Sequence, residues 1–405
     1  MEAVEDIVIV GAGIAGLATS LGLHRLGIRS LVLESADSLR TTGFALGMWT
    51  NAWRALDAIG VGEILRAKHH KLTGVVAASA TTGITTSQRP STAKDSQFDH
   101  EVRCISRKLL LETMENELPR GTIRYSSKVV HIEIDGHFKS IHLADGTVLK
   151  TKVLIGCDGV NSVVAKFIGF NKPAFVGRSA VRGIVYFEDG HGFEPKVMQF
   201  FGKGIRYGVI PMDDYGVYWF FSFSTPPQEK EIEEDPLKLK QFILSNLGKV
   251  SDKIKEVYER TELNNIICSA LRFRHPWELL WENITKDNIC VAGDAFHPMT
   301  PDLAQGGGAS LEDSIVLARN LALALKENDR KQEEDEYERI EEGLKKFARE
   351  RKWRIFDLIS ASYVVHLVQH GDNVLTNFLR DKMAKYLAGM LMKKAYFDCG
   401  KLIVS

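Results

Sequence analysis

The stretch of this chain that says most about its fold lies in its last third. It reads Gly293-Asp294-Ala295-Phe296-His297-Pro298-Met299-Thr300-Pro301-Asp302-Leu303-Ala304-Gln305-Gly306-Gly307-Gly308. Two further motifs precede it, and they read Gly11-Ala12-Gly13-Ile14-Ala15-Gly16 and Cys157-Asp158-Gly159-Val160-Asn161-Ser162. A simple nicotinamide dehydrogenase needs only the amino-terminal glycine pattern. Three motifs in this order therefore predict a longer dinucleotide, held by chain segments that are far apart in the sequence.

The composition favours a globular protein of more than one domain. The chain has 405 residues, of which 44% are hydrophobic and 26% are charged, and its net charge is zero. This length exceeds one ordinary core, so we expect two domains. A neutral chain gives no sign of a nucleic-acid partner or an anionic membrane. The five cysteines are scattered without a CxxC pair, which suits a reducing compartment and offers no disulfide or zinc framework.

The amino-terminal residues predict a cytoplasmic protein. Met1–Asp6 is acidic and leads directly into an apolar stretch, which leaves no room for a signal or transit peptide. No apolar run approaches the roughly 20 residues that a membrane helix needs. We therefore expect no membrane contact, and the oligomeric state stays open.

A βαβ unit surrounds the first glycine motif. The apolar run Ile7–Val10 predicts a buried parallel strand, Ile14–Leu26 has helical spacing, and Ser30–Glu34 predicts a second strand. A unit of about thirty residues is the context in which this glycine pattern indicates dinucleotide binding.

Each glycine of this motif has its own expected task. Gly11 permits the tight turn, Gly13 lets the backbone approach a pyrophosphate, and Gly16 lets helix and strand pack closely. The helix begins at Ile14 and Ala15, where unpaired N–H groups and the positive end of the helix dipole meet the phosphates.

Three carboxylates follow predicted strands. Glu34 ends the second strand, where a carboxylate binds a ribose hydroxyl and repels a 2′-phosphate, so FAD or NAD is favoured over NADP as the tightly bound nucleotide. Asp158 and Asp294 each follow a buried strand, at the edge where ligands of such sheets collect. The alternative is that each aspartate only caps the next turn. The nearby prolines and glycines favour a functional role for Asp294.

The rest of the chain alternates between sheet and helix patterns. Residues 72–99 and 180–223 have the alternation of antiparallel strands, and 123–149 predicts a meander with turns at Asp135-Gly136 and Asp145-Gly146. Helical spacing covers 52–68, 107–118, 228–260, 308–326 and the tail from 333.

We therefore expect an α/β fold with a Rossmann-like FAD-binding domain, an inserted antiparallel-sheet substrate domain and a C-terminal helical tail. The expected FAD-binding segments are 1–75, 102–180 and 286–330, the substrate segments are 76–101 and 181–285, and the C-terminal helices are 331–405.

In content and order, the three motifs resemble those of the single-component (group A) FAD-dependent aromatic monooxygenases. Within that group the chain is most similar to plant FAD-dependent monooxygenases that resemble salicylate hydroxylases, and the resemblance covers essentially the whole chain. It implies the aromatic hydroxylase fold. It also implies that Glu34 binds the adenosine ribose, that Asp158-Gly159 lies near the pyrophosphate and serves NAD(P)H use, and that Gly293-Asp294 contacts the ribityl chain.

The resemblance extends to two arginines. Arg40 and Arg107 match family arginines that approach FAD, although Arg107 could instead be an exposed residue at a helix start. One departure concerns the Asp-Gly motif, which in the family ends in Ser-x-Val-Arg. Here the sequence 162–166 reads Ser-Val-Val-Ala-Lys, so the choice between NADH and NADPH stays open.

A reaction follows from the resemblance. NAD(P)H reduces the flavin, O₂ adds at carbon 4a, and the hydroperoxide gives one oxygen atom to an electron-rich ring. Reduced flavin is anionic at nitrogen 1, and a helix start opened by Gly306, Gly307 and Gly308 would stabilise that charge. Pro301 would fix a loop that keeps water out. We expect no metal, because no cluster of ligands with suitable spacing is present.

Arg206 and Tyr218 are the candidates for substrate activation. They lie twelve residues apart on either side of a turn near Asp213-Asp214, and they match an Arg/Tyr pair of bacterial FAD-dependent urate hydroxylases. An arginine beside a carboxylate or enolate favours the anionic form. The alternative places Tyr218 in the sheet core and Arg206 on the surface. His297 is either a base near the substrate or a brace for its loop.

The expected function is a monooxygenase that consumes NAD(P)H and inserts one atom of O₂ into an aromatic or similarly electron-rich small molecule. Decarboxylative hydroxylation of a salicylate-like acid is one version, and epoxidation stays open. An alternative is a flavoprotein reductase or halogenase of the same scaffold that acts on an isoprenoid or an indole. The sequence lacks the Trp-x-Trp-x-Ile-Pro signature of flavin halogenases. A flavin-binding regulatory protein would need interaction domains for which the chain has no space.

Overall fold

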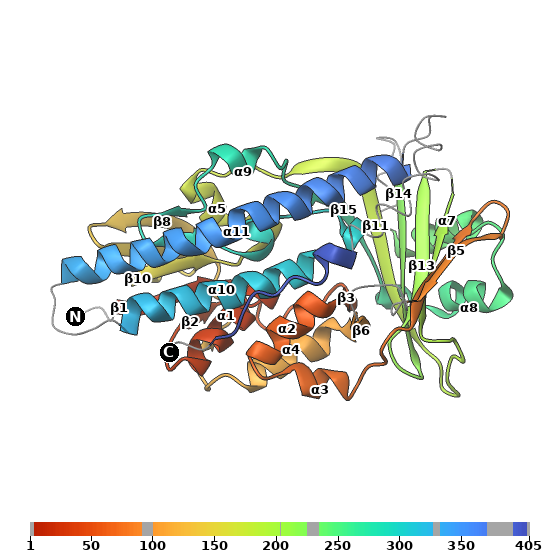
Figure 1. Cartoon of the computed structure of the whole chain (residues 1–405), viewed down its shortest axis with the longest axis horizontal. Coiled ribbons are helices and arrows are strands. Elements are labelled where there is room, and N and C mark those ends of the chain that lie inside the picture. The colour runs from red at the N-terminus through yellow and green to blue at the C-terminus, as the bar shows by residue number, and fades with distance from the viewer. Residues whose placement is uncertain are drawn as a thin grey trace.

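The described part of the chain forms two large sheets, a two-stranded sheet of β3 (Ala45–Met48) and β6 (Arg103–Ser106), and a layer of helices (Figure 1). The computed structural model describes residues 4–90, 100–202, 204–224, 235–326, 333–370 and 392–402. The predictions for residues 91–99, 228–234 and 371–391 therefore lie outside the described residues.

An eight-stranded sheet carries the first glycine motif. Its main path has the order β16-β17-β10-β1-β2-β7, and β9 and β8 continue from β10. The strands are β1 (Val4–Val10), β2 (Leu31–Leu33), β7 (Ile123–Arg124), β8 (Val129–Asp135), β9 (Phe138–Leu143), β10 (Val148–Gly156), β16 (Thr285–Lys286) and β17 (Ile289–Val291). The pairs β1–β2, β1–β10, β2–β7 and β10–β17 are parallel, as in a doubly wound sheet.

Strand β10 joins the predicted meander to the parallel sheet. One side of it pairs with β1, whereas the other side pairs first with β9 and then with β17. The two hairpin turns that join β8, β9 and β10 are confirmed. Ile123–Arg124 does not belong to the meander as predicted, because it pairs in parallel with β2.

Long helices cover this sheet. Figure 1 shows α1 (Ile14–Arg25) beside α10 (Gly306–Lys326), with α11 (Glu333–His370) running along α10. The helix predicted over 52–68 is divided into α2 (Thr50–Ala58) and α3 (Gly62–Arg66), because Gly60 adopts a positive φ of 80°. The shorter helices here are α4 (Arg107–Asn116), α5 (Val163–Ile168) and α9 (Glu278–Trp281).

A seven-stranded sheet forms the other half, in the order β15-β11-β14-β13-β12-β4-β5. Its strands are β4 (Gly74–Ser79), β5 (Thr85–Pro90), β11 (Ala174–Tyr186), β12 (Lys196–Phe201), β13 (Ile205–Pro211), β14 (Gly216–Ser224) and β15 (Ile266–Phe273). All pairs are antiparallel except β4–β12. The sheet begins at Gly74 and Ala174, a few residues before the segment boundaries that we expected.

The two faces of this second sheet have different neighbours. Trp219 and Phe221 belong to an apolar cluster with α7 (Pro236–Asn246) and α8 (Asp252–Arg260). The opposite face meets the rest of the molecule through a cluster that includes Tyr218 and Ile184, together with Ala45 of β3 (Ala45–Met48) and Cys104 of β6 (Arg103–Ser106). The sheet face that bears Tyr218 therefore forms the junction between the two halves.

Candidate active site

The first glycine motif forms a tight turn against the neighbouring strand end. Gly11 has a φ of 101°, and a Cβ there would lie 2.5 Å from the Cys157 carbonyl oxygen. A Cβ at Gly16 would lie 1.9 Å from the Gly11 oxygen, so both positions require glycine. Gly13 is different, since a Cβ there would meet nothing within 4 Å. The turn therefore presents a partly exposed backbone at Gly13, as binding of a pyrophosphate needs.

Glu34 holds this turn in place. Its carboxylate accepts hydrogen bonds from the N–H groups of Ala12 and Ala36, both at 2.9 Å, and Arg40 lies 3.1 Å away. Burial raises the pKa of Glu34, but the two N–H groups and Arg40 outweigh it, so the pKa lies below its usual value. The ionised carboxylate retains further acceptor capacity for a ribose hydroxyl.

The two aspartates that follow strands have different surroundings. Asp158 accepts hydrogen bonds from Oγ of Ser162, the N-cap residue of α5, at 2.5 Å and from the Val163 N–H at 2.7 Å, so it supports the start of that helix. Asp294 is exposed, and no residue in the described ranges donates a hydrogen bond to its carboxylate. This placement favours capping for Asp158 and leaves Asp294 available to a ligand.

The charge of Asp294 acts on Arg107. Burial lowers the pKa of Arg107, whereas Asp294 raises it and the cations Arg182 and Arg40 lower it further. Its Nε is buried and has no hydrogen-bond acceptor among the described residues. A buried guanidinium donor that lacks an acceptor fits an oxygen-rich or nitrogen-rich cofactor at this place.

The Gly-Asp loop, which begins at Gly293-Asp294, is held in place by Asp313 of α10. Gly293 has a φ of 61°, and its N–H donates to Asp313 Oδ2 at 2.9 Å. His297 is fully buried, with its Nε2 2.6 Å from the same oxygen. Burial raises the pKa of Asp313, but His297 and Arg351 more than offset this and lower it. The placement of His297 favours the loop brace over a base that contacts the substrate.

A buried charge network continues from Asp313 into the tail helix. Arg351 of α11 lies 2.7 Å from Asp313 Oδ1 and 2.8 Å from Glu312 Oε2. Glu312 accepts a hydrogen bond from Asn51 at 2.7 Å, and Asn51 also donates to Gln305 at 2.9 Å. We did not predict Asn51, Glu312, Asp313 or Arg351, whereas Gln305 belongs to the third motif. The signal was an adjacent acidic pair inside an otherwise apolar helix, a pattern that needs buried cations nearby.

The network ends where α10 begins. Gly306 and Gly307 are partly exposed, and a Cβ at Gly308 would lie 2.9 Å from the Asn51 side-chain nitrogen. The exposed Pro301 opens the short turn that precedes this helix. The start of this 21-residue helix therefore has accessible backbone, and the helix packs against the turn that carries Asp294.

Arg206 and Tyr218 occupy one sheet face without meeting. Arg206 lies opposite Ser222, four residues beyond Tyr218 on the same strand. Arg206 is buried and lies 2.9 Å from Asp302 Oδ1, and Arg178 lies 2.8 Å from the other oxygen of that carboxylate. The alternative of a surface arginine is therefore wrong, and Arg206 is part of a buried ion triad.

A cation that interacts with Tyr218 is a residue that we did not predict, Arg182 on β11. Burial raises the pKa of Tyr218 to about 12, and Arg182 partly offsets this shift. Arg182 also donates to Ser269 Oγ at 3.2 Å. Sequence reasoning missed Arg182, because the pairing of β11 with β14 is needed to bring it beside Tyr218.

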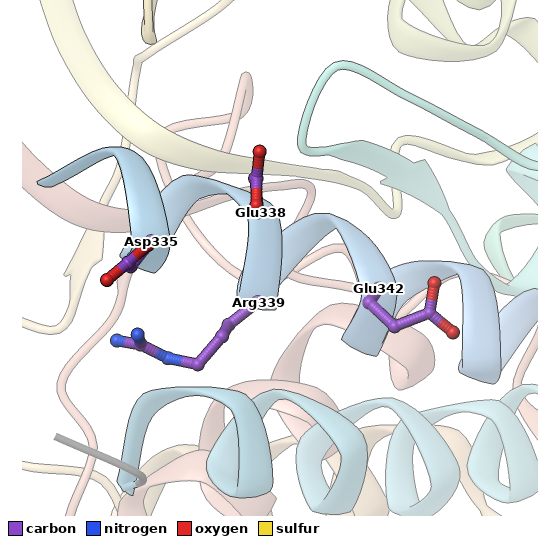
Figure 2. Close-up of a pocket in the computed structure, with 4 residues that line it drawn as sticks. All are labelled: Asp335, Glu338, Arg339 and Glu342. Atoms are coloured by element: carbon purple, nitrogen blue, oxygen red, sulfur yellow. The ribbon is translucent and has the colours of Figure 1, made fainter. Parts of the chain in front are cut away.

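A pocket near the start of α11 is lined by Asp335, Glu338, Arg339 and Glu342 (Figure 2). Figure 2 shows Arg339 extending toward the neighbouring helix, where its Nε donates to the Ala324 oxygen at 3.3 Å. We interpret these four charged side chains as an ion cluster in contact with solvent.

A family profile, related sequences and a solved structure are all consistent with an FAD site at this place. A family profile described as "FAD binding domain" matches residues 5–346. "Monooxygenase 2" of Arabidopsis thaliana is 50% identical over 99% of both chains, and "Monooxygenase 1" of the same plant is 36% identical over 98% of this chain and 99% of its own. Klebsiella pneumoniae HpxO, solved with FAD and uric acid, has a TM-score of 0.82 at 20% identity and covers 98% of each chain.

The chain therefore belongs to the FAD binding domain family and, within it, to the single-component FAD-dependent aromatic monooxygenases. It is an FAD-dependent monooxygenase with the aromatic hydroxylase fold, and FAD is its cofactor. In the ranges that the structure describes, no cluster of side chains suits a metal ion. No helix in those ranges has both the length and the apolar character that crossing a bilayer demands.

Proposed function

We propose that this enzyme uses NADH or NADPH to insert one atom of O₂ into an aromatic or similarly electron-rich small molecule. The observation that carries the proposal is the electrostatic link, near the junction of the two large sheets, from exposed Asp294 through partly buried Arg107 to Arg182, which interacts with Tyr218. When bound, FAD would accept electrons from the reductant and supply activated oxygen there. The related structure that contains uric acid, a small electron-rich heterocycle, supports this substrate class.

The proposed cofactor contacts come from all three motifs. The Gly13 backbone and the start of α1 would hold the pyrophosphate, Glu34 the ribose and Asp294 the ribityl chain. Asp158 would act indirectly, by capping the turn beside the pyrophosphate. The full proposed set is Gly11, Gly13, Ile14, Ala15, Gly16, Glu34, Arg40, Arg107, Asp158, Gly293, Asp294, Gly306, Gly307 and Gly308.

The chain's own groups would prepare the reaction in three ways. The α10 start would direct backbone N–H groups and its positive dipole end toward negative charge on the flavin ring. Pro301 would hold the loop that excludes water, and His297 would keep the Gly-Asp loop in position through Asp313. Tyr218 would orient a substrate oxygen, because its phenol stays protonated in neutral solution and can donate a hydrogen bond.

The experiment is a turnover assay with isotopic oxygen. The purified holoenzyme is mixed with NADH or NADPH and a panel of phenols and phenolic acids, under ¹⁸O₂. One ¹⁸O atom per product molecule, with matched reductant oxidation, supports the proposal, and loss of CO₂ from salicylate identifies the decarboxylative version. Reductant oxidation with a product that lacks ¹⁸O would instead support the reductase alternative. A halogenated product formed only with halide salts would support the halogenase.

A further inference from the structure

The junction face of the seven-stranded sheet bears three arginines, Arg178, Arg182 and Arg206. Two of them share one carboxylate: Arg178 and Arg206 lie 2.8 Å and 2.9 Å from the two oxygens of Asp302, whose side chain is almost completely buried. In this triad each arginine has an ion-pair partner, as buried charges require, although one carboxylate serves two cations and the cluster keeps a net positive charge.

Arg182 has a different environment. It is half-buried, it donates a side-chain hydrogen bond to the neutral hydroxyl of Ser269 at 3.2 Å, and it also interacts with the phenol of Tyr218. No acidic side chain in the described ranges lies within ion-pair distance of it. A guanidinium has five N–H donors, so a half-buried one with this neutral partner retains strong capacity for an anionic group.

Strand pairing places Arg182 beside Tyr218. Arg182 of β11 lies opposite Phe220 of β14, and Ile184 lies opposite Tyr218, so Arg182 and Tyr218 are diagonal neighbours on one face. The phenol of Tyr218 and the guanidinium of Arg182 interact directly. A hydrogen-bond donor and a cation therefore stand side by side on this face.

The same arginine lies close to the flavin-contacting residues that we propose. Its charge acts on Arg107. The groups with which Arg182 itself interacts are the cation Arg107 and the phenol of Tyr218, and the carboxylate of Asp294 also acts on Arg107. Cations outnumber anions in this group, and the proposed ribityl contact would engage Asp294.

We infer that Arg182, together with Tyr218, binds an anionic group of the substrate and so selects carboxylates or ring-oxygen anions over neutral aromatics. The inference rests on the proposed function, since it assigns a charge to the substrate of that site. The substrate-binding cation in this inference is therefore Arg182, whereas Arg206, the residue expected from the sequence, is ion-paired with Asp302. Charge-assisted hydrogen bonds are short and strong, and an arginine fork matches a carboxylate well.

Binding can be measured without turnover. Calorimetry on the oxidised holoenzyme would compare salicylate with salicylamide, and ionised 4-nitrophenol with 4-nitroanisole, so that carboxylate and phenolate are tested separately. We expect wild-type protein to bind at least one anion more than tenfold tighter than its neutral partner. We expect Arg182→Gln to remove that preference, Arg182→Lys to restore part of it, and the exposed control Arg260→Gln to leave it unchanged.

Several results would overturn the inference. These are equal binding of the anionic and neutral probes by the wild type, no binding of any probe, or a preference that survives in Arg182→Gln. Equal weakening of both probes by Arg182→Gln would show a packing role instead. Unfolding temperature and flavin content identify a misfolded variant, in which case Arg182→Lys decides the test. Anion selection through Arg182 without ¹⁸O in any product would contradict the proposed function and leave this inference intact.

Discussion

At the scale of single residues, Asp158 and Asp294 differ in their hydrogen bonding although their sequence contexts are similar. Asp158 and Asp294 both follow a buried strand, but the hydrogen bonds of Ser162 and Val163 occupy Asp158, whereas Asp294 is exposed. The difference arises from the next few residues. A serine and a helix start close behind Asp158 supply local donors, while the turn at Gly293 directs Asp294 outward.

The role of Asp294 can be tested by Asp294→Ala. We expect about a tenfold loss of FAD affinity, because a hydrogen bond to a charged group contributes about 1.5–3 kcal/mol. Flavin fluorescence titration of the apoprotein would measure it. Asp214→Asn, at the exposed hairpin turn, is the matched control. Unchanged affinity and turnover in Asp294→Ala would show that the motif was misassigned.

Tyr218→Phe separates a role in oxygen transfer from a role in packing. Removing only the hydroxyl keeps the apolar contacts of the junction cluster. We expect product formation to fall by about tenfold while flavin reduction by NAD(P)H stays within twofold. Stopped-flow reduction and product yield per reductant would measure the two effects. Equal product yield in the variant would place Tyr218 among the core residues.

At the scale of elements, helix α11 supports the loop that carries Asp294. Its Arg351 contacts both Glu312 and Asp313 of α10, and Asp313 holds Gly293 and His297. The tail helix therefore does more than pack on the surface of the FAD-binding part. It supplies the countercharge without which two buried carboxylates would lie side by side.

Arg351→Met tests this dependence. Both carboxylates lose a buried partner, so we expect a loss of about 3–5 kcal/mol in the free energy of unfolding, measured with urea. Weaker flavin binding should accompany it, and Arg351→Lys should recover part of both. Arg349→Met removes an arginine of the same helix that is largely exposed, and should change stability little. Equal losses of unfolding free energy in Arg351→Met and Arg349→Met would contradict a stabilising role for the buried charge network around Asp313.

At the scale of the whole molecule, α11 connects the two halves. Figure 1 shows it running from the eight-stranded sheet toward β14 and β15. Near its start Glu336 lies 3.1 Å from Lys152 of β10, and toward its end Tyr363 stacks on Phe273 of β15. The helix thereby helps to set how the face that bears Arg182 meets the loop that bears Asp294.

Acid should destabilise the whole molecule through its buried carboxylates. The pKa values of Glu34, Glu312 and Asp313 are lowered in the fold, so the unfolded chain binds protons first as pH falls. Their contribution is complete above the ordinary carboxyl pKa, near 4.5 for Glu34, and is lost as pH falls through the lowered value. Urea unfolding from neutral pH to about pH 3 measures this loss, and Glu34→Gln should flatten the curve. An unchanged slope would contradict the role of Glu34.

Much of the fold and the cofactor could be predicted from the sequence, because they depend on local chemistry. The backbone geometry at Gly11, Gly16 and Gly293 requires glycine, and only a few neighbouring residues determine it. The motifs and the order of strands and helices could therefore be predicted. The α/β class and the cofactor followed from those motifs. The division of the predicted 52–68 helix also has a local cause at Gly60.

Long-range register and packing decided the rest. No local pattern shows that Asp302 compensates Arg206, that Arg351 reaches Asp313, or that Arg182 lies beside Tyr218. A side chain's partner across a sheet changes completely when the strand shifts by one residue. Which buried charged side chains pair with each other depends on the folded surroundings, because these surroundings exclude water. Which arginine remains available to a substrate is therefore a property of the assembled fold.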